Sequence, residues 1–255
     1  METLQVTTHK DYAVVKLNRG RANPMNWQMV KDLKQAFQDL AADDAVRGVV
    51  LTGGEGYFSV GLDVVELYSH DEAAFEAFWR DFISLAEQLF AFPKALVAAI
   101  TGHSPAGGCV LALCCDYRIM AEGAYTIGLN ELAVGVVVPE PIFALLGDAT
   151  GRDKAYQFIL EAALLSPQAA REANMVHEIC PMAEVMDRAV RRLRKWFVFD
   201  DSAWRQTKFN LRRALRETFN QDFDVLHGET VRHWWSPDTR ARIENLVNLL
   251  KMKRG

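Results

Sequence analysis

The sequence lacks any apolar run long enough to cross a lipid bilayer. A membrane-spanning helix needs roughly 20 consecutive apolar residues, and no stretch of this 255-residue chain approaches that length. The opening residues, METLQVTTHKDYAVV, also lack the basic end, apolar segment and small-residue cleavage site of a secretory leader. We therefore expect no membrane partner and a cytoplasmic location.

Cysteine is also scarce. The chain has four cysteines, Cys109, Cys114, Cys115 and Cys180. Their spacing matches neither a metal site nor a disulfide framework, and the first three lie in an apolar run. We expect all four to be buried, reduced and structural, and we predict no metal site.

Low-complexity segments and sequence repeats are absent as well. With 50% hydrophobic and 24% charged residues, the composition is typical of a globular protein with a substantial core. The net charge of −4 conceals an asymmetry: the chain from Arg188 onward holds 16 Lys and Arg against 8 Asp and Glu, and the preceding part holds 13 against 25. The C-terminal quarter is therefore basic.

The first half of the chain alternates strand-like and helical patterns. Valine-rich or continuously apolar runs predict strands at 11–18, 46–53, 94–102, 116–121 and 124–129, and helical periodicity covers 27–44, behind Asn26 as N-cap, and 64–92. Such alternation predicts an α/β core with parallel strands. Beyond about residue 140 only helical patterns remain. We assign 1–195 to the α/β core and 196–255 to a C-terminal helical region.

Glycines directly precede an apolar run of helical length in SPAGGCVLALCC, residues 104–115. Glycine lowers helix stability by about 1 kcal/mol relative to alanine, so Gly107 and Gly108 serve something other than helix propensity. The start of a helix exposes unpaired N–H groups at the positive end of the helix dipole. Without a side chain, glycine lets a ligand oxygen approach them closely. The pattern predicts one half of an oxyanion hole.

A second glycine turn, FSVGLD at 58–63, follows another predicted strand, and its Gly61 frees the backbone around Val60. If the parallel strands ending near residues 53 and 102 are neighbours, both turns lie at the same sheet edge, where ligands collect. A single glycine turn is most often only a turn. Two such turns at one edge would direct two N–H groups at one oxygen.

Glu131 stands in an apolar segment, IGLNELAVGVVVP at 127–139. Burying a carboxylate there is costly and raises its pKa, which suits a general base working near neutral pH. The alternative is a solvated loop in which Glu131 pairs with an arginine.

These motifs, together with KLNRGRANPMN at 16–26 and CDYRI at 115–119, resemble the enoyl-CoA hydratase/isomerase (crotonase) superfamily in order and spacing, over essentially the whole chain. Within it the chain is most similar to the 3,2-trans-enoyl-CoA isomerases. The resemblance implies a crotonase-like (ClpP/crotonase) spiral of ββα units with a C-terminal helical trimerisation region. It also implies a homotrimer or a dimer of trimers.

The resemblance also implies roles for single residues. The thioester oxygen would accept hydrogen bonds from the backbone N–H groups of Val60 and Gly107, and Glu131 would be the proton shuttle. Hydratases carry a second glutamate where this chain has Val110. The expected reaction is therefore the shift of a 3-enoyl-CoA double bond to the trans-2 position, as in fatty-acid β-oxidation, with acyl-CoA as substrate and no cofactor.

Substrate contacts follow from the same resemblance. The candidates for binding acyl-CoA are Arg19, Arg21, Ala22, Gly61, Leu62, Asp63, Gly108 and, more weakly, Lys208. Glu140 is a possible additional acid, one position away from an aspartate of related dienoyl-CoA isomerases. Its alternative role is that of a surface or capping residue.

Two other functions stay open at this point. One is hydration or another acyl-CoA transformation on the same fold. The other is a non-catalytic or RNA-binding relative, which only the arginines of 188–196 and 205–216 support. Amphipathic helices present such arginines to solvent or to a neighbouring subunit as well, and we expect no nucleic-acid partner.

Overall fold

The computed structural model describes residues 1–252, except for the side chains of residues 226 and 227. Its strands form two sheets. The larger has the order β1 (Leu4–Thr8), β2 (Tyr12–Leu17), β3 (Gly48–Thr52), β5 (Ala95–Ile100), β7 (Tyr117–Ala121) and β9 (Glu178–Cys180). The smaller has the order β4 (Gly56–Tyr57), β6 (Gly102–Pro105) and β8 (Ile127–Gly128).

The larger sheet is parallel except for β1, which runs antiparallel to β2. Every residue of β3 and β5 is buried, as expected for central strands covered on both faces. The predicted α/β core with parallel strands is confirmed.

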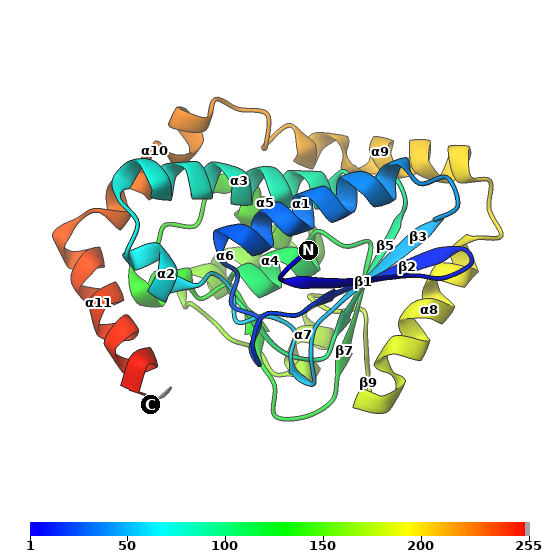
Figure 1. Ribbon diagram of the computed structural model, residues 1–255, viewed down its shortest axis with the longest axis horizontal. Coiled ribbons are helices and arrows are strands. Elements are labelled where there is room, and N and C mark those ends of the chain that lie inside the picture. Colours follow the sequence, from blue (N-terminus) through cyan, green and yellow to red (C-terminus); the bar gives the residue numbers. More distant parts are fainter. Residues whose placement is uncertain (253–255) are drawn as a thin grey trace.

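Helices cover both faces of this sheet and extend beyond its end (Figure 1). They are α1 (Trp27–Ala42), α2 (Val64–Tyr68), α3 (Glu72–Phe90), α4 (Gly107–Leu113), α5 (Glu140–Thr150), α6 (Arg152–Leu160), α7 (Pro167–Glu172), α8 (Val185–Trp196), α9 (Asp201–Arg216), α10 (Phe223–Trp234) and α11 (Pro237–Met252), with 3-10 turns η1 (Glu131–Val134) and η2 (Met182–Glu184). None of the described helices is long and apolar enough to span a membrane.

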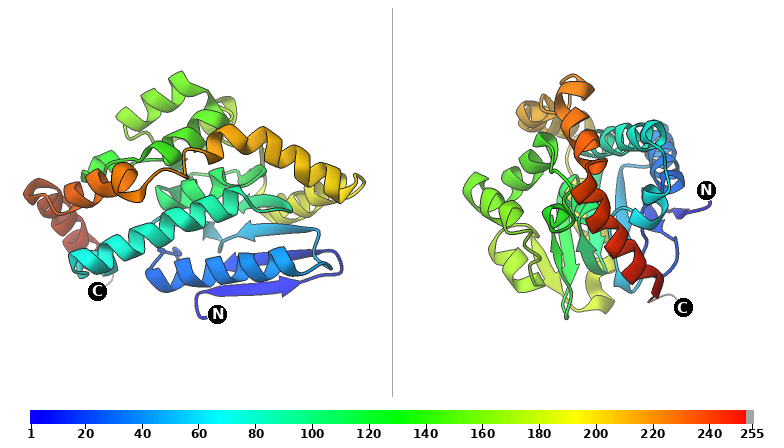
Figure 2. Two further views of the ribbon diagram at one scale, coloured as in Figure 1. Left: turned by 90° about the horizontal axis from the view of Figure 1, so that it is seen from above. Right: turned by 90° about the vertical axis from the view of Figure 1, so that its left-hand side faces the viewer.

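The hydrophobic core lies on both sides of the large sheet. On one side α1 and α3 lie next to each other, as both views of Figure 2 show, and bury apolar faces that include Phe37 and Phe78. On the other side α8 packs its Ala189 and Leu193 against Val97 of β5. The helices on the two faces thus hold the central strands β3 and β5, after which the two glycine turns follow in the chain.

The structure differs from the predicted elements in several places. The strands β1 and β4 were not predicted, the predicted strand 94–102 ends at Ile100 and a separate strand, β6, begins at Gly102, and the run at 124–129 contributes only the two residues of β8. The helical segment 64–92 divides into α2 and α3, because Asp71 starts a new helix by accepting a hydrogen bond from Ala74 N–H. Beyond residue 140 the chain is not purely helical, since β9 pairs with β7. Short strands stabilised by distant partners leave little periodicity in the sequence.

The predicted boundary between residues 195 and 196 falls at the end of α8, which still packs on the sheet. The helices α9, α10 and α11 follow it and make up the described part of the predicted C-terminal region. Residues 253–255 of that region lie outside the described residues. The division into two regions stays a prediction.

Candidate active site

The two glycine turns lie next to each other. The strands β3 and β5 are parallel neighbours, which confirms the pairing on which the predicted juxtaposition depended. Directly before the turns, β4 and β6 pair in parallel as well, with Gly56 opposite Gly102. Both turns therefore leave the same edge of the small sheet.

Close packing between the turns explains their glycines. Gly61 has φ +87°, and a Cβ added to it would lie 3.0 Å from the backbone nitrogen of Gly107. A Cβ on Gly108 would overlap the carbonyl oxygen of Ser59. Any larger residue would push the two turns apart. The glycines therefore allow the backbones of the two turns to lie in contact, although glycine is unfavourable in a helix.

Two backbone N–H groups at this junction have no acceptor among the described residues. Gly107 is the first residue of α4, where the helix supplies no partner for its N–H group. The Leu62 N–H group likewise makes no hydrogen bond within the described chain, although its neighbours do: Gly61 O accepts from Met25 N and Asp63 N donates to Met25 O, both at 2.8 Å. Gly107 and Leu62 both line the same cavity.

Val60 was predicted to supply the second donor, and the structure does not support that role. Its N–H group donates to the carbonyl oxygen of Ala22 at 3.0 Å. This hydrogen bond attaches the turn to the loop after β2 and leaves the Val60 N–H group unavailable to a ligand. The available donor is two residues further on, at Leu62.

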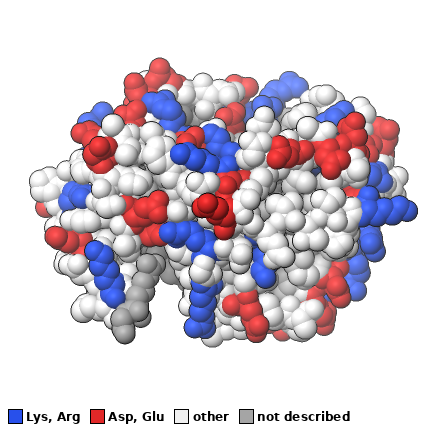
Figure 3. Space-filling view, in the orientation of Figure 1, with Lys and Arg blue, Asp and Glu red and all other residues white. Residues whose placement is uncertain are grey.

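The cavity next to these donors has a volume of about 910 Å³. Its walls are mostly apolar and come from the glycine turns, η1 and the helices α3, α10 and α11; among the lining residues are Phe75, Trp79, Phe82, Val136, Val138, Ile142, Trp234, Leu246 and Leu250. The face in Figure 3 is notched at the lower left, and Lys and Arg side chains lie along the right-hand side of this notch. An elongated molecule with an apolar tail and an anionic end fits such a cavity.

Glu131 lies in this cavity, at the first position of η1. Its Oε2 atom is buried and has no hydrogen-bond partner among the described residues. Burial raises the pKa of this carboxyl group to about 7, from an ordinary value of 4.5. The residue as a whole is half-buried, so the predicted burial holds for its Oε2 atom and not for all of Glu131. The alternative, a pair with an arginine, is not observed within the described chain.

Neither Val110 nor Glu140 provides a second acid to the cavity. Val110, on the first turn of α4, is buried and lines the cavity. Glu140 starts α5, is exposed, and accepts a hydrogen bond from Gln221 Nε2 at 3.3 Å. It does not line the cavity, in keeping with its alternative role as a surface residue.

Arg19 and Asp63 line the cavity but bind each other. Arg19 donates to Asp63 Oδ2 at 2.7 Å and to the carbonyl oxygen of Pro24 at 2.9 Å. Asp63 Oδ1 also caps α2 by accepting from Val65 and Glu66 N–H groups. The charge of Arg19 is therefore balanced within the protein, which does not support its predicted contact with the substrate.

The other predicted contacts divide into two groups. Arg21 and Ala22 line the cavity, and Arg21 is exposed with its guanidinium carbon 5.8 Å from the centre of the Tyr57 ring. Gly61 and Gly108 bring the turns together but do not line the cavity themselves. Arg21 is thus the candidate whose charge remains available to an anionic ligand.

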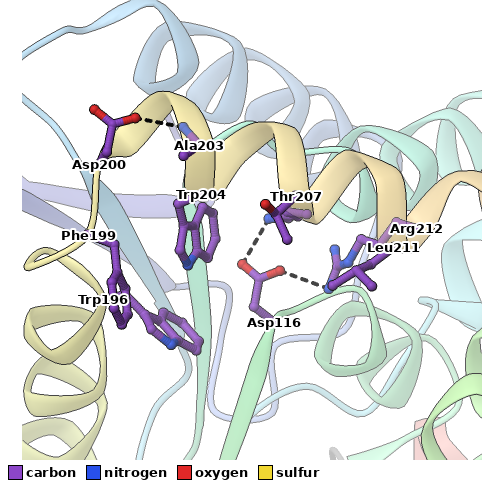
Figure 4. A pocket seen from close by; sticks show the side chains of 10 residues that line it. Asp116, Trp196, Phe199, Asp200, Ala203, Trp204, Thr207, Leu211 and Arg212 are labelled. Carbon is purple, nitrogen blue, oxygen red and sulfur yellow. Dashed lines mark hydrogen bonds and ion pairs between the residues drawn. The ribbon is translucent and has the colours of Figure 1, made fainter.

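Lys208 lies elsewhere, in the lining of a second cavity of about 550 Å³. Trp196 and Trp204, of α8 and α9, line the same cavity (Figure 4). Its ammonium group is buried and donates to Asp116 Oδ2 at 2.8 Å and to the carbonyl oxygen of Lys94 at 3.0 Å. Burial lowers the pKa of Lys208 to about 8. The structure therefore does not support the predicted contact between Lys208 and acyl-CoA.

Several cavity residues were not identified from the sequence. Asn130 has a buried Oδ1 atom without a partner among the described residues, and Leu246 and Leu250 come from the last helix. Trp234 stacks on Phe75, with ring centres 4.2 Å apart, and it also lines the cavity. Periodicity marks such residues as apolar without showing which cavity they close.

A family model described as enoyl-CoA hydratase/isomerase matches residues 7–232. Among curated relatives, the mitochondrial enoyl-CoA delta isomerase 1 of Mus musculus is 36% identical over 249 residues, 95% of this chain and 85% of that protein. A putative enoyl-CoA hydratase of Thermus thermophilus is 36% identical over 181 residues, 69% of this chain and 71% of its own length.

Solved structures agree with the sequence relatives. The human mitochondrial delta3-delta2-enoyl-CoA isomerase superposes with a TM-score of 0.95 at 28% identity, over 99% of this chain and all of that one. An enoyl-CoA hydratase/isomerase from Xanthobacter autotrophicus superposes with a TM-score of 0.84 at 25% identity, over 99% of this chain and 98% of that one. The crotonase-like α/β fold predicted from the motifs is therefore confirmed. The chain belongs to the enoyl-CoA hydratase/isomerase family.

Proposed function

We propose that this protein is an enoyl-CoA isomerase that moves the double bond of a 3-enoyl-CoA to the trans-2 position, without a metal or other cofactor. One observation carries the proposal: the Glu131 carboxyl group, with a pKa of about 7, shares a cavity with two backbone N–H groups that have no acceptor among the described residues. Asp63, the other carboxylate that lines this cavity, is paired with Arg19. The similarity to proteins named as delta isomerases supports it.

The reaction needs a base that removes a proton from C2 of the acyl chain. The electron pair left at C2 delocalises onto the thioester oxygen and forms a dienolate. The Leu62 and Gly107 N–H groups stabilise the negative charge that develops on this oxygen; losing one such donor costs about 2.7–4 kcal/mol.

Glu131 completes the reaction by returning its proton to C4. The double bond then lies between C2 and C3, and the carboxylate is regenerated. A pKa of about 7 makes Glu131 both basic enough to remove the C2 proton and acidic enough to release it near neutral pH. The acid and the base are thus one residue, and no second carboxyl group is needed.

Hydration is the closest alternative, because it adds water to a 2-enoyl-CoA. Orienting a nucleophilic water and moving its proton ordinarily takes two carboxylates. Val110 is apolar where the second would lie, and Glu140 is outside the cavity. These two positions favour isomerisation.

Product analysis tests the proposal. The purified protein is incubated with a 3-enoyl-CoA and, separately, with a 2-enoyl-CoA. We expect conversion of the first to the trans-2-enoyl product and little 3-hydroxyacyl product from the second. Efficient hydration of the 2-enoyl substrate would contradict the assignment, and no reaction with either would point to another acyl-CoA transformation.

A further inference from the structure

Leu62 N–H and Gly61 C=O belong to the same planar peptide group and point in opposite directions. Whatever holds the Gly61 carbonyl therefore sets the direction of the Leu62 N–H group. The Gly61 carbonyl accepts from Met25 N–H at 2.8 Å. The donor at Leu62 is thus oriented by Met25, in the loop of residues 18–26 between β2 and α1.

Met25 also contacts the other donor. Its side chain is fully buried, and a Cβ added to Gly107 would overlap its Cε atom. Met25 therefore lies between the two turns, with its backbone bound to residues 61 and 63 and its side chain against Gly107. A displacement of Met25 would change the relative position of both N–H groups.

Arg19 holds this segment in place. The same guanidinium nitrogen, Nη1, donates to Pro24 O at 2.9 Å and to Asp63 Oδ2 at 2.7 Å. The peptide after Pro24 carries the Met25 N–H group, and Asp63 N–H donates to Met25 O at 2.8 Å. Arg19 thus connects two loop segments, residues 24–25 and 61–63. Their hydrogen bonds fix the direction of the Leu62 N–H group.

The ion pair between Arg19 and Asp63 is partly buried and has a second acidic neighbour. The Asp63 side chain is 5% exposed and that of Arg19 is 27% exposed. A second carboxylate oxygen, Glu66 Oε2, lies 3.5 Å from Arg19 Nη2. Charge-assisted hydrogen bonds at partly buried positions are stronger and more directional than exposed ion pairs. Two acidic neighbours balance the guanidinium, so it is poorly placed to recognise phosphates.

We propose that Arg19 is a positioning residue for the oxyanion hole: paired with Asp63, it holds Pro24 and Met25 so that the Leu62 N–H group points into the cavity. This inference rests on the proposed function only in using Leu62 as a donor. It differs from the sequence prediction, in which Arg19 binds acyl-CoA.

The test compares Arg19→Ala, Asp63→Asn and the double variant with the unmodified full chain. Asp63→Asn has nearly the same shape and keeps an Oδ1 atom to cap α2, so it covers the case that Arg19→Ala does not fold. The control is Asp81→Asn, which breaks the Lys34–Asp81 pair of 2.6 Å between α1 and α3, outside the cavity.

Two quantities are measured on each folded variant. The first is kcat and KM for a 3-enoyl-CoA. The second is the infrared stretching frequency of the thioester carbonyl in a bound saturated acyl-CoA, with and without a carbon-13 label, which reports polarisation by the N–H donors without any turnover.

We expect each single variant to lower kcat roughly 10- to 100-fold, with a smaller change in KM, because a slightly misplaced donor loses much of its effect. The carbonyl frequency should move toward that of the free thioester. The double variant should be no worse than the stronger single one, because both break the same contact. Asp81→Asn should leave kcat and the carbonyl frequency unchanged.

An unchanged kcat and carbonyl frequency in folded Arg19→Ala and Asp63→Asn would overturn the proposal. So would a raised KM alone, which would mean that Arg19 contacts the substrate. If the unmodified protein polarises the carbonyl but does not isomerise, only the proposed reaction fails, and the carbonyl frequencies still decide the role of Arg19. If it does not polarise the carbonyl at all, the oxyanion site and this proposal both fail.

Discussion

At the scale of single residues, the proposed chemistry depends on a carboxyl group whose Oε2 atom the fold keeps away from water. Glu131 Oε2 has no partner among the described residues, and burial raises the pKa of the group to about 7. To act as the proposed general base, Glu131 must be ionised. We therefore predict that kcat/KM for a 3-enoyl-CoA rises tenfold per pH unit below about pH 7 and levels off above it. A profile that is flat between about pH 5 and pH 8 would contradict this role.

The same shift makes folding stability depend on pH. Between the ordinary pKa of 4.5 and the folded value of about 7, the folded chain binds more protons than the unfolded chain, so its stability falls as pH rises through this interval. Glu131→Gln removes the effect. We predict that the free energy of unfolding of the variant, taken relative to that of the unmodified protein, rises by about 2–3 kcal/mol from about pH 5 to about pH 8.

Urea denaturation of Glu131→Gln and of the unmodified protein, at about pH 5 and about pH 8, measures this change in relative stability. The control is Glu76→Gln, on an exposed face of α3, which should show no such gain. A stability difference between Glu131→Gln and the unmodified chain that is the same at both pH values would mean that Glu131 titrates normally.

At the scale of the elements, the start of α4 shows why helix propensity is overridden. Gly108→Ala would ordinarily favour a helix by about 1 kcal/mol, but its Cβ would overlap Ser59 O. We predict that this substitution instead destabilises the fold and lowers kcat. Gly147→Ala in α5 is the matched control, since its Cβ would meet nothing closer than 4.0 Å, and it should stabilise the chain by about 0.5–1 kcal/mol. Thermal unfolding compares the two; equal effects would contradict the account.

The attachment of α9 to the core rests on a buried cluster of charges (Figure 4). Asp116 binds Lys208 at 2.8 Å and Arg212 at 2.9 Å, and each side chain is largely buried. Removing the carboxylate leaves two buried cations without their partner, so Asp116→Ala should destabilise the fold by about 3–5 kcal/mol. KM for acyl-CoA should stay unchanged in the folded variant, because the cluster lies outside the active-site cavity. A raised KM would restore the predicted contact between Lys208 and the substrate.

Local patterns in the sequence identified some of this site and missed the rest for a physical reason. Gly107 and Glu131 stand out because glycine before a helix and a carboxylate in an apolar run are locally unfavourable. The choice between Val60 and Leu62 depends on which N–H group a distant carbonyl, Ala22 O, accepts from. The closure of the cavity by Leu246 likewise depends on how α11 folds back over η1.

At the scale of the whole molecule, several cations of the basic C-terminal quarter are engaged by contacts inside the chain. Arg188 pairs with Glu178 and Glu184, and Arg192 donates to the Tyr117 hydroxyl at 2.7 Å. On the face shown in Figure 3, side chains of both signs are interspersed. These contacts weaken the RNA-binding alternative, for which the C-terminal arginines were the support.

The association of subunits stays a prediction. The resemblance to the family implies trimers, or trimers in pairs, and exposed apolar side chains such as Phe199 and Leu211 offer surface for such contacts. We predict a mass of about three or six times 28.7 kDa by light scattering during size-exclusion chromatography. A monomer at micromolar concentration would contradict the predicted assembly. The predicted cytoplasmic location also stays a prediction, and the mammalian relatives are named as mitochondrial.

The central claim is that one carboxyl group carries the proton, and the turnover of Glu131→Gln with a 3-enoyl-CoA tests it most directly. We predict that the variant folds, binds acyl-CoA with similar affinity, and loses roughly 10²- to 10⁴-fold in kcat. A folded Glu131→Gln variant that isomerises the substrate within a few-fold of the unmodified rate would contradict the mechanism.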